Sequence, residues 1–525
     1  MQIYSYIKKK VFPTALLFVF ILSCLNTFAQ PATITIPVGV GRNCGGNAST
    51  DSIKYFNYNV STNVLSHRSN CKPLLTPQAF SAGFASTTFN PFDGRLYYIR
   101  IVDMGGGVYN SYTYRWLPTI CPNTAPALDT VKMFPNQIVA GVEFDPNTGM
   151  GYQVNFVGPG AGPWDIELQS VDFNTGAVGA SLPVNFGGRK FYRQAGDMVM
   201  SPSGQLLAIF NNKYFTVNWQ DYGVNPLVAT YIDTLNFGTR NLIGLAYSGG
   251  KLVGAAQNGA GNSCGYYEID ILTGAQSNIT QTGGNVSSWD MTNIGTGIGA
   301  AKELVSAVEN PAGSGIYDIQ YDVILRNYGS TPVSNVMVTD TLTKINGAAN
   351  LISASTSIIS SPPGFTSSPG FNGAGNYGLI LPGSTLSNRP GMNTVVIRVN
   401  CRVSNILRGV VYNNQAYVTA TNIFGEALRD SSTNGRVPDL NTNDRPDDVG
   451  ESQPTPLLIA VVAQTPPCVS LARVMYTQNF GAGASIVTGA GSIPAATVGS
   501  GAFLPTGVTY YGNAPAIPIP TDTYG

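Results

Sequence analysis

Charged side chains and histidine are scarce in this chain. Only 11% of its 525 residues are charged, and 28 acidic residues balance 28 basic ones. A nucleic-acid surface needs clustered Lys and Arg, so this composition argues against nucleic-acid binding and against polybasic attachment to a membrane. The single histidine, His67, would have to serve any Ser-His-Asp triad, and its polar surroundings are typical of a solvated side chain.

Long apolar runs are absent after the first thirty residues, so we expect no later transmembrane segment. Lys8 to Lys10 precede an apolar stretch that ends at Leu25, and Thr27-Phe28-Ala29 is typical of a signal-peptidase site. We therefore expect residues 1–29 to be a signal peptide and the mature protein to be secreted or held at the cell surface. A lipoprotein signal ending before Cys24 is the alternative.

Six cysteines remain after the one in the signal peptide, and none forms a Cys-x-x-Cys pair, which argues against structural zinc. Export permits disulfides, and the first four of the six can pair among themselves in three ways. We expect Cys401 to be a buried free thiol, because it continues an inward-facing apolar row of a strand. The six are Cys44, Cys71, Cys121, Cys264, Cys401 and Cys468.

Glycine, proline and aromatic residues are abundant: 60 Gly, 34 Pro, 27 Tyr and 23 Phe. No stretch has a sustained helical period, so these residues predict an all-β protein of short strands and tight turns.

A weak repeat covers residues 30–297. Turns that close on Gly94, Gly149, Gly204 and Gly250 each join two apolar strands, at intervals of about 46 to 55 residues. This spacing predicts a β-propeller of five or six blades, and the N-terminal segment 53–64 is expected to close its ring. A less regular solenoid or two stacked sandwiches is the alternative. The expected inner strands lie near Gly83, Gly141, Met198, Ile243 and Trp289.

A second turn pattern recurs on the expected outer strands. Val171 to Gly176 and Ile269 to Gly274 are alike, and Phe56 to Asn63 is a weaker copy. Asn63 replaces the closing glycine there, which is acceptable because Asn also tolerates the left-handed conformation. The whole repeat array resembles the propeller-like ectodomains that precede surface repeats in exported bacterial proteins.

The stretch from Ile316 to Leu342 has a period of two, with apolar residues on one face, and predicts two half-buried strands. Tyr321-Asp322-Val323, Asn335 to Leu342 and Asn413 to Ala420 follow in an order that resembles the domain-of-unknown-function-11 repeat of bacterial surface proteins. The resemblance implies an immunoglobulin-like sandwich over residues 298–457 and a role in spacing or adhesion. Residues 351–392 depart from it and are expected to form a long loop.

Asp439, Asn441 and Asn443 place oxygen-bearing side chains at alternate positions, a pattern that hard calcium ions favour. Asp444 and Gly450 stand where a helix–loop–helix calcium loop has Gly and Glu, so a solvated linker is the alternative. We expect no other cofactor. In residues 458–525, Tyr476 to Gly481 resembles the first strand of lectin-like jelly rolls, although the segment is too short for that fold.

Three carboxylates, Glu143, Asp197 and Asp290, lie on or beside expected inner strands and could face the channel. A propeller glycosidase would need two of them about 5–5.5 Å or about 6.5–9.5 Å apart. The alternative is that they accept hydrogen bonds from backbone amides. We favour this second interpretation and predict a non-catalytic exported protein that acts in adhesion or display, with a glycan or a surface protein as partner.

Overall fold

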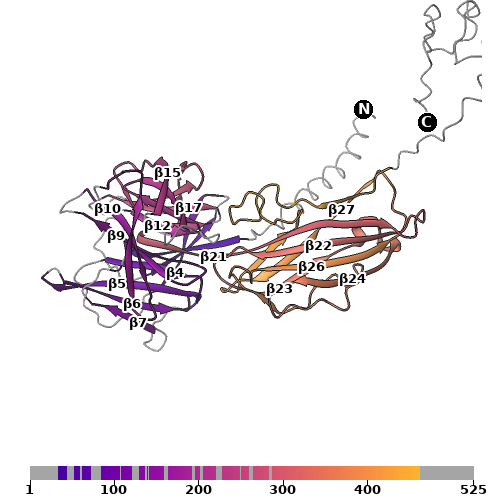
Figure 1. Cartoon of the computed structure of the whole chain (residues 1–525), viewed down its shortest axis with the longest axis horizontal. Coiled ribbons are helices and arrows are strands. Elements are labelled where there is room, and N and C mark those ends of the chain that lie inside the picture. The colour runs from indigo at the N-terminus through magenta and orange to yellow at the C-terminus, as the bar shows by residue number, and fades with distance from the viewer. Residues whose placement is uncertain are drawn as a thin grey trace, which may run out of the picture. The chain divides into compact units, whose positions relative to one another are not determined.

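The computed structural model describes residues 33–461, except 44–52, 60–61, 72–83, 107, 121–128, 136–138, 140, 159–162, 192–195, 202–204, 220–226, 249, 259–263 and 283–285. The expected signal peptide and the segment after residue 461 lie outside the described residues. The described chain is an all-β protein, a β-propeller followed by an immunoglobulin-like sandwich (Figure 1). None of its described helices is long and apolar enough to cross a membrane.

Four blades of the propeller each contain four antiparallel strands in chain order. Their inner strands, β4, β8, β12 and β16, lie where the turn spacing predicts them. The blades are β4 (Phe84–Asn90), β5 (Arg95–Gly105), β6 (Val108–Trp116) and β7 (Asp129–Phe134); β8 (Val142–Phe144), β9 (Gly151–Val157), β10 (Asp165–Val171) and β11 (Val178–Asn185); β12 (Gly196–Met200), β13 (Leu206–Phe210), β14 (Lys213–Val217) and β15 (Leu227–Thr234); β16 (Asn241–Ser248), β17 (Lys251–Gln257), β18 (Cys264–Asp270) and β19 (Gln276–Asn278).

The fifth blade joins the two ends of the propeller sequence. Its inner strand is the first half of β21 (Val286–Glu309), which pairs with β1 (Thr33–Asn43). β2 (Ile53–Asn59) and β3 (Val64–Cys71) follow, and β20 (Thr280–Thr282) runs parallel to β3. The five inner strands touch in the ring order β21, β4, β8, β12, β16 and back to β21. The predicted closure by the N-terminal segment is therefore confirmed, and the ring has five blades.

The repeated turns adopt the backbone conformation that their sequences require. Gly94 and Gly149 have φ of 71° and 69°, the left-handed region that costs glycine little. Asn63, expected to replace a closing glycine, has φ of 53°. Asp172 and Asp270 open the two outer turns, where each carboxylate accepts hydrogen bonds from the amides two and three residues ahead.

The sandwich packs two sheets over one core. The apolar row predicted on β22 is buried throughout, from Tyr317 to Leu325. One sheet contains the second half of β21, then β22 (Tyr317–Asn327), β26 (Thr394–Val403) and β24 (Leu351–Ser360), with β30 (Thr433–Asn434) beside β21. The other contains β25 (Ser384–Leu386), β23 (Val333–Asp340), β28 (Ala416–Thr421) and β29 (Ala427–Ser431). β27 (Val411–Asn414) pairs with β31 (Thr455–Leu458), and the short helices α2 (Thr343–Asn346) and η3 (Ala348–Asn350) precede β24.

The prediction of a long loop over residues 351–392 is wrong for its first ten residues and for the short strand β25. Leu351–Ser360 form the edge strand β24, which pairs with β26. Half of its side chains are Ser or Thr, and all ten are at least partly exposed, so the segment resembles a loop in composition. The pairing partner and not the local sequence decides its conformation.

Strand β21 belongs to both domains. It pairs with β1 up to Gly297 and with β22 from Ile298 onward, so a single continuous strand joins propeller to sandwich. Of the cysteines, Cys71 and Cys264 are each disulfide-bonded. Cys401 is a buried free thiol, as predicted.

Candidate functional site

The structure brings Glu143, Asp197 and Asp290 together at the centre of the propeller. They come from β8, β12 and β21, and their residues are only 5 to 8% exposed. Their charges act on one another, and the carboxyl groups of Asp197 and Asp290 share a hydrogen bond. The sequence-based expectation that these side chains face a common space therefore agrees with their positions.

Each of these carboxylates accepts a hydrogen bond from the next inner strand. Asp290 accepts from the Thr87 amide at 2.8 Å and from the Ser86 hydroxyl at 2.5 Å, both on β4.

Asp197 accepts from the Leu245 amide of β16 at 2.7 Å, and Glu143 from the Met200 amide of β12 at 3.4 Å. Inner strands of neighbouring blades do not form backbone ladders with one another, so their inward N–H groups need such acceptors. The three side chains thus fasten one blade to the next.

Burial dominates the protonation of these carboxyl groups. Desolvation raises the pKa of Glu143, and the Asp290 charge raises it further, against the Met200 amide. Desolvation also raises the pKa of Asp197, with further increases from the Asp290 charge and from the hydrogen bond between the two carboxyls. The pKa of Asp290 is raised by desolvation, against the donors that lower it, the Ser86 hydroxyl first among them. Because neighbouring carboxyls disfavour each other's ionisation, the Asp290 charge favours the protonated form of Asp197.

Asp197 and Asp290 interact with each other, and each also accepts a hydrogen bond from a backbone amide of the next inner strand. Hydrogen bonds of this kind are what the structural alternative predicts. Glu143 faces the same centre, but its described hydrogen bond goes to a backbone amide.

The cavity beside Glu143 holds little more than water. Its volume is about 40 Å³, and Glu143, Met200 and Thr292 line its propeller side. Ser330 and Asn388 of the sandwich line it too. Drug-sized ligands occupy pockets of about 300–1,000 Å³, so this cavity does not accommodate a sugar ring.

A larger depression lies on the outer part of the fourth blade. Its volume is about 460 Å³, and amide side chains line much of it. Arg240 donates a hydrogen bond to the Tyr267 hydroxyl at 2.7 Å, which fixes two of its polar groups. Sequence reasoning missed this groove, because its residues come from a turn and two outer strands. The lining residues are Asn236, Phe237, Gly238, Arg240, Tyr267, Gln276, Ser277 and Asn278.

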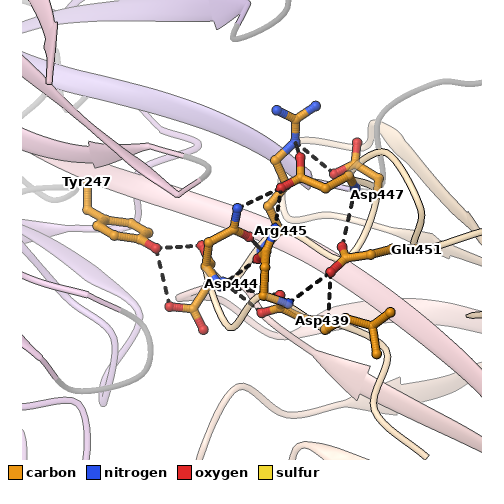
Figure 2. A network of polar contacts seen from close by, with 10 residues as sticks. Tyr247, Asp439, Asp444, Arg445, Asp447 and Glu451 are labelled. Atoms are coloured by element: carbon orange, nitrogen blue, oxygen red, sulfur yellow. Dashed lines mark hydrogen bonds and ion pairs between the residues drawn. The ribbon is translucent and has the colours of Figure 1, made fainter. Parts of the chain in front are cut away.

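The Asp-rich loop, residues 439–451, lies against the propeller (Figure 2). Tyr247 of β16 donates a hydrogen bond to the Asn443 carbonyl at 2.6 Å, and its hydroxyl also contacts the Asp444 carboxylate at 3.4 Å. Asp439 and Glu451 are 3% and 2% exposed. Leu440, Asn441 and Val449 are exposed, so the loop is solvated only in part.

The oxygens of the Asp-rich loop bind its own backbone. The Asp439 carboxylate accepts from the amides of Asn443 at 3.2 Å and Asp444 at 2.8 Å, and Asn441 Oδ1 also accepts from Asn443 at 3.1 Å. Asp444 has φ of 61°, the conformation for which a calcium loop uses glycine. Among the residues that the structure describes, no group of three or more His, Cys, Asp or Glu is placed to hold a metal. Calcium binding by Asp439, Asn441 and Asn443 stays a prediction.

Comparisons with known proteins find structural likenesses of low score and low identity. No protein-family profile matches the sequence, and no curated protein matches it. Among solved structures, an exo-β-1,3-galactanase from Phanerochaete chrysosporium is 12% identical, with a TM-score of 0.29, covering 70% of this chain and 94% of the other.

Adhesins and pilins are also among the similar structures. The major pilin subunit BcpA of Bacillus cereus is 9% identical, with a TM-score of 0.18, over 44% of this chain and 55% of the other. The collagen adhesin of S. aureus is 8% identical, with a TM-score of 0.15, over 66% and 91%. Likenesses at these scores carry no argument about activity.

Proposed function

We propose that this chain is an exported, non-catalytic protein that presents its propeller for adhesion or surface display. The observation that carries the proposal is the state of the three central carboxylates. They accept backbone hydrogen bonds from neighbouring blades, and the cavity beside Glu143 has a volume of about 40 Å³. A hydrolytic site needs room for a substrate between its carboxyls.

The join between the domains supports a display role. β21 continues from the propeller into the sandwich without a break, so no flexible linker separates the two domains. Arg68 pairs with Glu426 at 2.9 Å, and Arg389 donates to the Phe92 carbonyl at 3.0 Å. Contacts from several sides of one strand fix the propeller on the sandwich, as a presented binding surface requires. The resemblance to surface repeats, the expected signal peptide and the disulfides agree with this role.

The polar groove on the fourth blade is where we propose that a glycan binds. Amide side chains and an arginine donate and accept the hydrogen bonds that sugar hydroxyls need, and the volume of about 460 Å³ suits a small oligosaccharide. Asn278 is exposed in this groove, and its removal leaves the β18–β19 pairing intact because that pairing uses backbone atoms.

A glycan array probed with the full chain tests the proposal. Binding that Asn278→Ala abolishes, and that Asn174→Ala on the second blade leaves unchanged, is the expected result. An array without binding, or binding that both variants retain, would contradict the groove as the site.

A further inference from the structure

A lysine and an aspartate form an ion pair in the core of the sandwich. Lys302 of β21 contacts the Asp340 carboxylate at the end of β23, and both side chains are 0% exposed. The Lys302 ammonium also lies 4.1 Å from the centre of the Tyr321 ring. The described residues give this ammonium one carboxylate and one aromatic face, although it carries three donors. Burial of an ion pair is unfavourable unless further hydrogen bonds satisfy its remaining donors and acceptors.

Unsatisfied polar atoms surround this pair. Within the described residues, Asp340 Oδ1, Asn414 Nδ2, Tyr321 Oη and Thr433 Oγ1 are buried without a hydrogen-bond partner. Buried polar groups in folded proteins nearly always have partners, so four exceptions near one another need an explanation.

Strand pairing places Asn414 beside Lys302. Thr455 is the register partner of Asn414, and its hydroxyl donates to the Lys302 carbonyl at 2.6 Å. On the other side, Asp340 is the register partner of Ala416, two residues after Asn414. Asn414 is 1% exposed and so points into the same core. One amine, one carboxyl and one carboxamide therefore converge where water is excluded.

We propose that Lys302 and Asn414 form an intramolecular amide bond, with Asp340 as the proton shuttle. Asp340 takes one proton from the Lys302 ammonium, and the neutral Nζ attacks Cγ of Asn414. Asp340 gives that proton to Nδ2 and takes the second proton from Nζ as the Cγ–Nδ2 bond breaks, so ammonia leaves and Asp340 holds the remaining proton. Amine and carboxamide become a secondary amide and ammonia, so no oxidant or other reactant is needed.

Asn414 and not Asp340 is the acceptor for a chemical reason. Joining Lys302 to Asp340 would expel water and would need a third group to move protons. The described atoms near the pair that lack partners are an amide and two hydroxyls, none of which is a carboxyl. With Asn414 as acceptor, Lys302 is the nucleophile, Asp340 transfers the protons and Asn414 is attacked. The fixed proximity of the three groups accelerates the reaction. The bond would tie the first strand of the sandwich to β27.

Peptide mapping of the purified full chain by mass spectrometry tests the proposal. The expected result is a branched peptide that joins Lys302 to Asn414 and lacks the mass of one ammonia. Separate, unmodified peptides from the folded protein would overturn the proposal. A branched peptide through Asp340 that lacks the mass of one water would overturn the assignment of Asn414.

Three variants and a matched control separate the roles. Lys302→Arg and Asp340→Asn should both leave Asn414 unmodified, the first for lack of an amine and the second for lack of a shuttle. Asn414→Asp should still cross-link, but with loss of water. Asn413→Asp alters the exposed neighbouring amide and should leave the ammonia loss unchanged. If Asp340→Asn cross-links as fully as the natural chain, the shuttle role is wrong.

Discussion

Replacing Asp290 by alanine should weaken the propeller more than the sandwich. The change leaves the buried Thr87 amide and Ser86 hydroxyl without their acceptor. Each unsatisfied buried donor costs about 1–3 kcal/mol, and relief of the buried carboxyl offsets part of the total, so we expect a loss of about 2–4 kcal/mol. All four tryptophans lie within residues 30–297, so tryptophan fluorescence during guanidinium unfolding reports on this domain alone.

Asp172→Ala is the matched control. Asp172 also accepts hydrogen bonds from two amides and a hydroxyl, but it does so in an exposed outer turn. Water can replace those hydrogen bonds, so removal of the Asp172 carboxylate should lower the free energy of unfolding by less than about 1 kcal/mol. Asp290→Asn keeps one acceptor oxygen and should fall between the two. Equal losses for Asp290→Ala and Asp172→Ala would refute the role of the central carboxylates in fastening the blades.

Three further outcomes follow from the sandwich and the Asp-rich loop. Burial raises the pKa of Asp430 to about 8, so the folded state holds a proton that the unfolded chain loses. Stability should therefore fall as pH rises from about 4 to about 8. Asp430→Asn should flatten this fall in thermal unfolding followed by circular dichroism, and an unchanged profile would exclude Asp430 as its source. Tyr247→Phe removes the hydrogen bond to the Asn443 carbonyl, which costs about 1 kcal/mol. Proteolysis of the Asp-rich loop should therefore be faster in this variant. The control Tyr231→Phe, on an exposed strand, should leave the rate of proteolysis unchanged. Calcium should slow the same cleavage and lose that effect in Asp439→Ala; identical cleavage with and without calcium would remove the calcium prediction.

The ring of blades was predictable because its turns are local. Glycine closes the turn after four inner strands, proline precedes it in the first three, and the turns recur at similar intervals. Asn63 and Gly94 reach the left-handed conformation through their own chemistry. The strand that closes the ring was predictable too, since the last inner strand has no outer strands after it.

The partners of the carboxylates were not predictable to the same degree. The sequence places Asp290 on an inner strand, but the Thr87 amide that it accepts from lies about two hundred residues away. The packing of the Asp-rich loop against Tyr247 is equally non-local. One signal was present and unused: Lys302 interrupts an inward row of otherwise apolar residues, which indicates a buried charge with a partner.

Hydrolysis of a broad oligosaccharide panel by the intact chain tests the non-catalytic role most directly. Glu143→Gln, Asp197→Asn and Asp290→Asn serve as comparison variants, each keeping the size of the side chain. We predict no sugar release above buffer by the intact chain or by any variant. Turnover by the intact chain that falls at least about 100-fold in one of these variants would show general acid or base catalysis by that carboxyl and would contradict a display function.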